Sequence, residues 1–423
     1  EQVFRYECQR SAQPALEALD AFVARTGAAF VAGHNLLRHD WRIIRDAAPR
    51  LRLLSLPVVD TLFLSPLAFP ENPYHHLVKD YKLVRDSFSD PVADARLARQ
   101  LLSDECAELA RRTAAAQVDV LSLYRFCFAN GIATDRGVEP AGGLVRFFDL
   151  LGAQAIDTSA AQRIFEQAAA DRVCPAAVQN VFADCLQTQP TAVLMPAVAY
   201  CAAWLPVAGG NSVLPPWVRF QFPEVVRLIK QLRDVPCDRR DCPYCSQTHN
   251  PVEQLQKYFS FSEFRSTPAA ADGSSLQEAI VRRGMSDQPL LAILPTGGGK
   301  SLCYQLPALV RNQRRGVLTV VLSPLQALMK DQVDNLIARS CPSAAALCGL
   351  LTPLERRQVL EQVRLGDVAI LYVSPEQLRN KSTTDAIRQR EIGCWVFDEA
   401  HCLSKWGHDF RPDYLYAARF IRE

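Results

Sequence analysis

The chain has 423 residues, of which 49% are hydrophobic and 22% are charged, and its formal net charge at pH 7 is +2. A chain of this length can bury the cores of two or three domains, and its composition excludes a largely disordered protein. Because the net charge is so close to zero, a uniformly basic nucleic-acid-binding coat is also excluded. Any DNA contact must be concentrated in a local patch.

Most of the 14 cysteines stand alone in apolar surroundings, which is typical of buried, reduced thiols rather than of a disulfide framework. We therefore expect a reducing compartment, the cytoplasm. The chain begins with Glu1 and has no N-terminal signal pattern, so we expect an excerpt of a longer reading frame. Residues 191–218 contain no charge, but prolines and glycines interrupt them, which favours a packed internal segment over a membrane-spanning helix.

The first 235 residues show two kinds of pattern. Apolar spacing predicts helices over 13–26 and 90–102 and short strands at 28–32 and 58–62, so residues 1–100 have an α/β order. Residues 101–235 are rich in Ala, Leu and Val at helical spacing and contain no catalytic constellation. We expect them to form a helical connector.

Residues 236–250 gather three cysteines and a histidine within a short polar stretch. Three thiolates and an imidazole can close on one tetrahedral ion. The spacing is not that of a standard zinc finger, so a structural zinc site and free loop cysteines both stay open. An iron–sulfur cluster is a third alternative, although no fourth thiolate lies nearby in the sequence. The candidate ligands are Cys237, Cys242, Cys245 and His249.

Residues 290–310 carry the densest pattern of the chain. The apolar run 290–294 predicts a buried strand, the glycines that follow predict a tight turn, and Lys300 begins an apolar helix. Such a turn cradles phosphates with backbone N–H groups, while the lysine adds a positive charge and Ser301 binds Mg²⁺. The strand–turn–helix order argues against a chance lysine in a structural turn. The predicted nucleotide-binding residues are Thr296, Gly297, Gly298, Gly299, Lys300 and Ser301.

Three further apolar runs, at 316–322, 368–373 and 394–397, predict parallel strands that end in polar residues. Open α/β sheets bind ligands at the carboxyl ends of their strands. Asp398, at the end of the third run, can hold Mg²⁺ opposite Ser301, and Glu399 can polarise an attacking water.

From residue 251 onward, these motifs resemble in kind and order those of RecQ-family DNA helicases of superfamily 2. Leu294 stands where the strict P-loop pattern has a glycine, a departure typical of that superfamily. The resemblance implies that Gln277, with Arg265 near it, brackets adenine. It implies that His401 couples the nucleotide site to DNA and that an aromatic-rich loop at 404–414 senses single strands. The implied DNA contacts are Ser323, Gln326, Lys330, Ser374, Trp406, His408, Phe410 and Arg411.

Residues 33–40, 60–62 and 90–95 resemble motifs of DnaQ-like 3′–5′ exonucleases, which hold two metal ions with four carboxylates. Asp40 and Asp94 match two of those four positions. The other two would precede Glu1, and Ser89 stands where many relatives have a histidine base. The resemblance implies a partial domain with a vestigial metal site rather than a nuclease.

The sequence thus predicts an α/β chain: a partial RNase H-like exonuclease domain (1–100), a helical connector (101–235), a Cys/His cluster (236–250) and a RecA-like P-loop domain (251–423). By lineage we expect an ATP-dependent 3′–5′ DNA helicase of the cytoplasmic nucleoid. It would use ATP and Mg²⁺, with zinc as one alternative at the cluster, and bind single-stranded and partly duplex DNA but no membrane. We expect no unwinding without a second motor domain. The alternatives are a nucleic-acid-binding module with a relic P-loop and an active 3′–5′ exonuclease. The predicted catalytic residues are Lys300, Asp398, Glu399 and His401.

Overall fold

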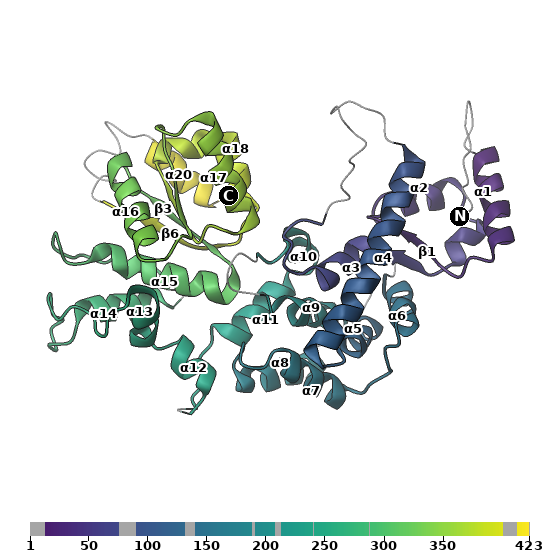
Figure 1. The fold of residues 1–423 in the computed structure, drawn as a ribbon, viewed down its shortest axis with the longest axis horizontal. Helices are drawn as coiled ribbons and strands as arrows, with labels where there is room; N and C mark the ends of the chain where they lie inside the picture. Colours follow the sequence, from purple (N-terminus) through teal and green to yellow (C-terminus); the bar gives the residue numbers. More distant parts are fainter. Residues whose placement is uncertain are drawn as a thin grey trace.

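The computed structural model describes residues 13–75, 90–131, 140–187, 191–207, 213–239, 241–286, 288–400 and 413–422. Figure 1 shows two lobes that meet near α11 and α12. We call residues 13–233 the N-terminal lobe and residues 251–422 the C-terminal lobe. Residues 234–250 are the linker between them.

The N-terminal lobe begins with an α/β unit. Strands β1 and β2 are parallel, with Gly33 opposite Asp60, and each is only three residues long. The α/β order predicted for residues 1–100 is confirmed, although the strands are shorter than expected. The elements are α1 (Gln13–Thr26), β1 (Val31–Gly33), α2 (Asp40–Ala47), a 3₁₀ turn (Arg52–Ser55), β2 (Val58–Asp60), α3 (Thr61–Ala68) and α4 (Pro91–Ala116).

Helices fill the rest of this lobe and share one hydrophobic core with the α/β unit, from Leu37 to Leu232. At its centre lies α9, where Tyr200 and Trp204 are buried and the Tyr200 hydroxyl donates to the carbonyl oxygen of Phe63 at 3.0 Å. The uncharged stretch beginning at 191 is therefore a packed internal helix. No helix in the described ranges is long and apolar enough to cross a membrane. The helices are α5 (Val120–Ala129), α6 (Pro140–Leu150), α7 (Thr158–Ala168), α8 (Pro175–Gln187), α9 (Thr191–Trp204), α10 (Pro216–Gln221) and α11 (Glu224–Arg233).

The C-terminal lobe is built on a four-stranded parallel sheet with the strand order β4-β5-β3-β6. Alternate residues of the inner strand β3 face opposite hydrophobic cores. Val321 packs with α15 and α16, while Val320 packs with α17 and α20. This is the predicted RecA-like arrangement. The strands are β3 (Leu318–Leu322), β4 (Ala344–Leu347), β5 (Ile370–Val373) and β6 (Ile392–Phe397). The linker and the rest of the lobe supply α12 (Pro243–Thr248), α13 (Pro251–Phe259), α14 (Leu276–Gly284), α15 (Lys300–Arg315), α16 (Gln326–Ala338), α17 (Pro353–Leu365), a 3₁₀ turn (Pro375–Arg379), α18 (Lys381–Arg388) and α20 (Asp413–Arg422).

The predicted buried strand at 290–294 is wrong. This run has no strand structure, and Leu291 and Ile293 are 79% and 81% exposed. Apolar composition favours burial, but a strand also needs a hydrogen-bonding partner, and β6 pairs only with β3 among the described strands. The phosphate-binding turn is therefore held by hydrogen bonds from neighbouring side chains rather than by a preceding strand.

Candidate functional site

The predicted phosphate-binding turn leads directly into α15. Gly297 and Gly299 have φ angles of +79° and +77°, a region that favours glycine. Gly299 is the N-cap of α15 and offers no side-chain cap, and the first helical turn contains no acidic residue. The positive end of the helix dipole and the first N–H groups of α15 are thus available to an anion, with Lys300 exposed beside them.

Gln277 and Arg265 hold this turn from outside. The Gln277 side chain accepts a hydrogen bond from the Arg265 N–H at 3.1 Å and donates one to the Gly299 carbonyl oxygen at 3.2 Å. The Arg265 guanidinium donates to the Gly297 carbonyl oxygen at 2.5 Å. Ser275, the N-cap of α14, also donates to the Arg265 carbonyl oxygen, which brings the two ends of residues 265–275 together. Both residues of the predicted adenine bracket therefore contact the turn, while their contact with a base stays a prediction.

Three polar residues follow the carboxyl ends of adjacent strands. Each donates its backbone N–H to a carbonyl oxygen of the neighbouring strand and so continues the hydrogen-bonding pattern of the sheet. Ser323 donates to Val373 at 3.2 Å, Ser374 to Leu347 at 3.2 Å, and Asp398 to Leu322 at 3.0 Å. Ser323 and Ser374 are buried, and neither hydroxyl has a hydrogen-bond partner in the described residues. One edge of the sheet thus presents a carboxylate and two buried hydroxyls.

The Asp398 carboxylate lies close enough to the P-loop to sense its charge. Burial and the neighbouring Glu399 raise the pKa of Asp398, whereas the Glu399 N–H, at 3.1 Å, and the positive charge of Lys300 lower it. Glu399 has a φ of +52°, an uncommon conformation that turns the chain away directly after the strand. Carboxylate and hydroxyl oxygens are ligands that Mg²⁺ accepts, so Asp398 and Ser301 are a chemically suitable pair.

A glutamine that the sequence analysis did not single out connects this site to the next helix. Gln305, one turn into α15, donates hydrogen bonds to the Gln332 side chain at 2.8 Å and to the Tyr372 hydroxyl at 2.9 Å. It therefore joins the P-loop helix to α16 and to β5. No motif marks Gln305, because its role depends on three elements that only the fold brings together.

The predicted DNA contacts divide into two groups. Ser323 and Ser374 lie at the strand ends, and Gln326 and Lys330 lie one turn apart on the same face of α16, with Lys330 exposed. The second group lies outside the described residues, as does one predicted catalytic residue. These residues are His401, Trp406, His408, Phe410 and Arg411.

The cysteines of the linker do gather, but with a different fourth member from the one predicted. The Sγ atoms of the three linker cysteines and of Cys174, which directly precedes α8, all lie within 4.8 Å of one another. His249 is outside this group: its ring packs 6.1 Å from that of Tyr244, and burial together with Arg314 lowers its pKa to about 4. Because Cys174 is 63 residues before Cys237, sequence spacing could not reveal it.

The two carboxylates of the exonuclease-like motifs line one cleft of about 1100 Å³. Asp40 begins α2, and Asp94 lies in the first turn of α4. No third carboxylate or histidine joins them as a metal-binding group within the described ranges. Asp60, between them in sequence, is buried, and burial raises its pKa to about 6. Its carboxylate accepts hydrogen bonds from the backbone N–H groups of Asn35, Leu37 and Leu62, and these limit the rise.

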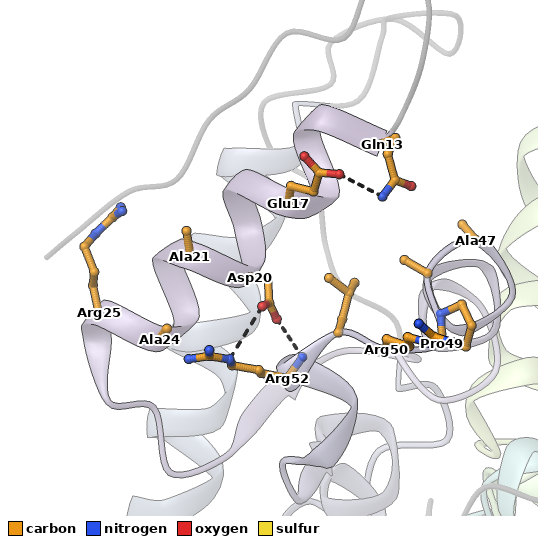
Figure 2. Close-up of a pocket in the computed structure, with 12 residues that line it drawn as sticks. Gln13, Glu17, Asp20, Ala21, Ala24, Arg25, Ala47, Pro49, Arg50 and Arg52 are labelled. Carbon is orange, nitrogen blue, oxygen red and sulfur yellow. Dashed lines mark hydrogen bonds and ion pairs between the residues drawn. The ribbon is translucent and has the colours of Figure 1, made fainter.

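A second cavity, of about 730 Å³, lies between α1 and the segment that leads into the first 3₁₀ turn (Figure 2). Two contacts join residues of its lining: Asp20 accepts from the Arg52 N–H at 2.6 Å, and Gln13 donates to Glu17 at 3.0 Å. None of the predicted site residues lines it.

Comparisons with known proteins agree with this geometry for the C-terminal lobe. Residues 274–423 match the DEAD/DEAH box helicase family. Probable ATP-dependent DNA helicase RecS of Bacillus subtilis is 41% identical over 162 residues, which cover 38% of this chain and 30% of that protein. ATP-dependent DNA helicase Q4 of Mus musculus is 46% identical over 153 residues (35% and 12%). ATP-dependent DNA helicase RecQ of Haemophilus influenzae is 39% identical over 160 residues (38% and 24%).

The P-loop helix and the four-stranded parallel sheet form a RecA-like domain, and this part of the chain carries the DEAD/DEAH box helicase match. Over 35–38% of its length, the chain is similar to proteins named as RecQ-type ATP-dependent DNA helicases. The chain spans less than a third of the length of these three relatives. The family match begins at residue 274, so the likeness of residues 1–100 to DnaQ-like exonucleases stays a prediction.

Proposed function

We propose that this chain supplies the nucleotide-binding motor domain of an ATP-dependent 3′–5′ DNA helicase. ATP and Mg²⁺ would lie between the turn at 297–301 and the Asp398 carboxylate. The observation that carries the proposal is the arrangement at the sheet edge: Asp398 continues the end of β6, where burial raises its pKa, and Lys300 at the start of α15 is near enough for its charge to oppose that rise. Two elements far apart in sequence thus bring a cation and a carboxylate to the same sheet edge.

Each residue of this site has a distinct proposed task. Lys300 and the first N–H groups of α15 bind the phosphates, and Ser301 and Asp398 hold Mg²⁺. The bound metal neutralises charge that develops on the transferred phosphoryl group. Glu399 orients and deprotonates the attacking water. Gln277 fixes the turn against α14 and would read the adenine edge.

Binding of nucleotide separates this proposal from a nucleic-acid-binding module with a relic P-loop. A fluorescent ATP analogue, titrated in the presence of Mg²⁺, should bind Lys300→Ala at least about tenfold more weakly than the unmodified chain, because a charge-assisted phosphate contact is lost. Lys381→Ala is the matched control, since Lys381 is also an exposed lysine at the first position of a helix. Equal affinity for all three proteins would establish the relic P-loop instead.

We propose that single-stranded DNA crosses the strand ends and α16, with the loop at 404–414 completing the contact. Lys330→Ala should weaken binding of a labelled oligonucleotide in an anisotropy titration. It should also reduce the slope of log affinity against log salt concentration by about 0.7, because one phosphate contact on a single strand contributes that much to the slope. Lys381→Ala should leave that slope unchanged. An unaltered slope for Lys330→Ala would remove α16 from the DNA path.

We expect the purified chain to bind ATP and DNA without separating strands. A second motor domain would have to supply the arginine finger, which is worth roughly 10³–10⁵ in rate in enzymes where it has been measured. A strand-separation assay with a 3′-tailed duplex tests this expectation. ATP-dependent unwinding by the chain alone would show that the second domain is dispensable.

The second candidate function is 3′–5′ exonuclease activity in the cytoplasmic nucleoid. Asp40 and Asp94 line one cleft, which favours it, but the two-metal mechanism needs further carboxylates. We therefore expect no Mn²⁺-dependent trimming of a 3′-labelled oligonucleotide. Trimming that Asp40→Asn abolishes would overturn this expectation.

A further inference from the structure

Four cysteines from two separate parts of the chain converge on one point. Cys174 belongs to the N-terminal lobe, while Cys237, Cys242 and Cys245 belong to the linker. The Sγ atoms of Cys174 and Cys242 are 4.0 Å apart, and all four Sγ atoms lie within 4.8 Å of one another. We propose that this group is a structural zinc site that fastens the linker to the N-terminal lobe.

The spacing of the sulfur atoms favours a single ion. Four thiolates each about 2.3 Å from one zinc ion form a tetrahedron with edges of about 3.8 Å. The 4.0 Å separation of Cys174 and Cys242 is close to such an edge, and it is far longer than the S–S bond of about 2.05 Å in a disulfide. A four-iron cluster sits between its thiolates and holds them further apart than one ion does. Zinc is therefore the metal that this group fits.

The surroundings provide the second shell that a thiolate site needs. The backbone N–H of Cys237 donates to the sulfur of Cys245 at 3.5 Å, which favours a negatively charged sulfur.

Hydrophobic burial alone does not explain the cluster. Its buried members are all cysteines, and only a few small or partly buried side chains, such as Ala176 and Tyr244, pack against them. Among its described residues, 234–239 and 241–250, the linker has one helix of six residues and otherwise no regular structure. A segment with so small an apolar core gains its fixed shape from the four metal–ligand bonds.

The position of the group shows what the zinc would accomplish. On the N-terminal lobe, the Cys174 N–H donates to the Leu232 carbonyl oxygen at 3.1 Å, and the Arg233 side chain donates to the Arg172 carbonyl oxygen at 2.9 Å. The start of α8 is thereby fixed to the end of α11, directly before the linker begins.

The same linker holds the end of the P-loop helix. The Asp234 carboxylate pairs with Arg315 at 2.8 Å, Arg233 donates to the Arg314 carbonyl oxygen at 2.7 Å, and Arg314 donates to the carbonyl oxygen of Thr248. Zinc would therefore fix a short segment whose two ends, Asp234 and Thr248, both contact the carboxyl end of α15. The nucleotide turn is at the other end of that helix.

Metal analysis of the full chain tests the proposal without reference to ATP. After exhaustive dialysis, mass spectrometry of the metals should find about one zinc ion per chain in the unmodified protein, in His249→Ala and in Cys127→Ser. Cys127 is the matched control, because it is a fully buried cysteine of the same lobe as Cys174. Cys174→Ser should lose its zinc.

Cobalt substitution of the unmodified chain gives a readout that does not depend on a variant folding. The proposal predicts the visible absorption of a tetrahedral Co²⁺ ion with four thiolate ligands, at one ion per chain. Three results would overturn it: no bound metal, a bound iron cluster with its own visible absorption, or zinc that is lost in His249→Ala and retained in Cys174→Ser.

Discussion

The side-chain amide of Gln277 donates a hydrogen bond of 3.2 Å to the carbonyl oxygen of Gly299, the last residue before the P-loop helix. A Cβ atom at Gly299 would stand 2.3 Å from the Gln277 amide nitrogen, and the φ of Gly299 is +77°. Space and backbone conformation thus both require glycine. This contact joins the phosphate turn to α14.

Gly299→Ala should weaken binding of a fluorescent ATP analogue by at least about tenfold, because the added methyl group displaces Gln277 and the strained turn moves its N–H groups. Gly142→Ala is the control: Gly142 lies in α6, and a Cβ there would meet nothing within 4 Å. Circular dichroism would verify that both variants fold. Wild-type affinity in Gly299→Ala would mean that the turn does not bind phosphate.

Gln277→Ala should weaken nucleotide binding severalfold while leaving the thermal unfolding temperature nearly unchanged, because the turn loses a brace but the hydrophobic core is intact. Gln254→Ala is a matched control. Gln254 is also a buried glutamine whose amide donates to a backbone carbonyl, that of Gln247 at 2.8 Å, and it lies in α13. Equal losses of affinity in both variants would show a general effect of cavity formation rather than a role for Gln277 in the site.

The placement of the candidate nucleotide-binding residues was predictable from sequence, because these residues are contiguous or follow apolar strands. Lys300 and Ser301 stand next to the glycines that form the turn, and Asp398 follows six apolar or small residues of β6. Local chemistry alone therefore specified their positions. The same reasoning failed for 290–294, since an apolar run does not indicate whether a strand partner exists.

The sequence did not reveal the features that depend on contacts between distant segments. Cys174 joins the linker cysteines only because α8 is fixed to α11, and Gln305 connects three elements through side chains without a motif. A histidine near three cysteines was the natural fourth ligand by spacing, but His249 lies beyond the cluster. Long-range packing decided each of these outcomes.

Arg390 should contribute strongly to the stability of the C-terminal lobe. This buried guanidinium donates to the carbonyl oxygens of Val363, Val368 and Gly316 at 2.7, 3.1 and 2.9 Å, at the base of the sheet. Arg390→Met leaves these three acceptors without a donor, so we expect a loss of about 3 kcal/mol or more in denaturant unfolding. Arg357→Met, at an exposed position of α17, should change stability by less than about 0.5 kcal/mol. Equal midpoints for the two variants would contradict this assignment.

Glu105 should make the N-terminal lobe less stable as the pH rises. Its side chain is fully buried on α4 and accepts a hydrogen bond of 2.5 Å from Ser65, and burial raises its pKa from 4.5 to about 9. The folded state therefore retains a proton that the unfolded chain releases above pH 4.5, so stability falls as pH rises until the folded pKa is passed.

Glu105→Gln keeps a neutral side chain at every pH and removes this dependence. Between pH 5 and 9, the stability of the variant relative to wild type should increase with pH, by up to about 1.4 kcal/mol per unit. Glu108→Gln provides a control: its difference from wild type should be constant between pH 5 and 9 and should change, with opposite sign, only below about pH 4.5. Hydrogen bonding to Arg111 lowers the pKa of Glu108, so the native Glu108 stabilises the fold at higher pH and loses that effect as pH falls. Urea unfolding followed by tryptophan fluorescence measures both differences, and a pH-independent difference for Glu105→Gln would show that Glu105 is ionised in the folded protein.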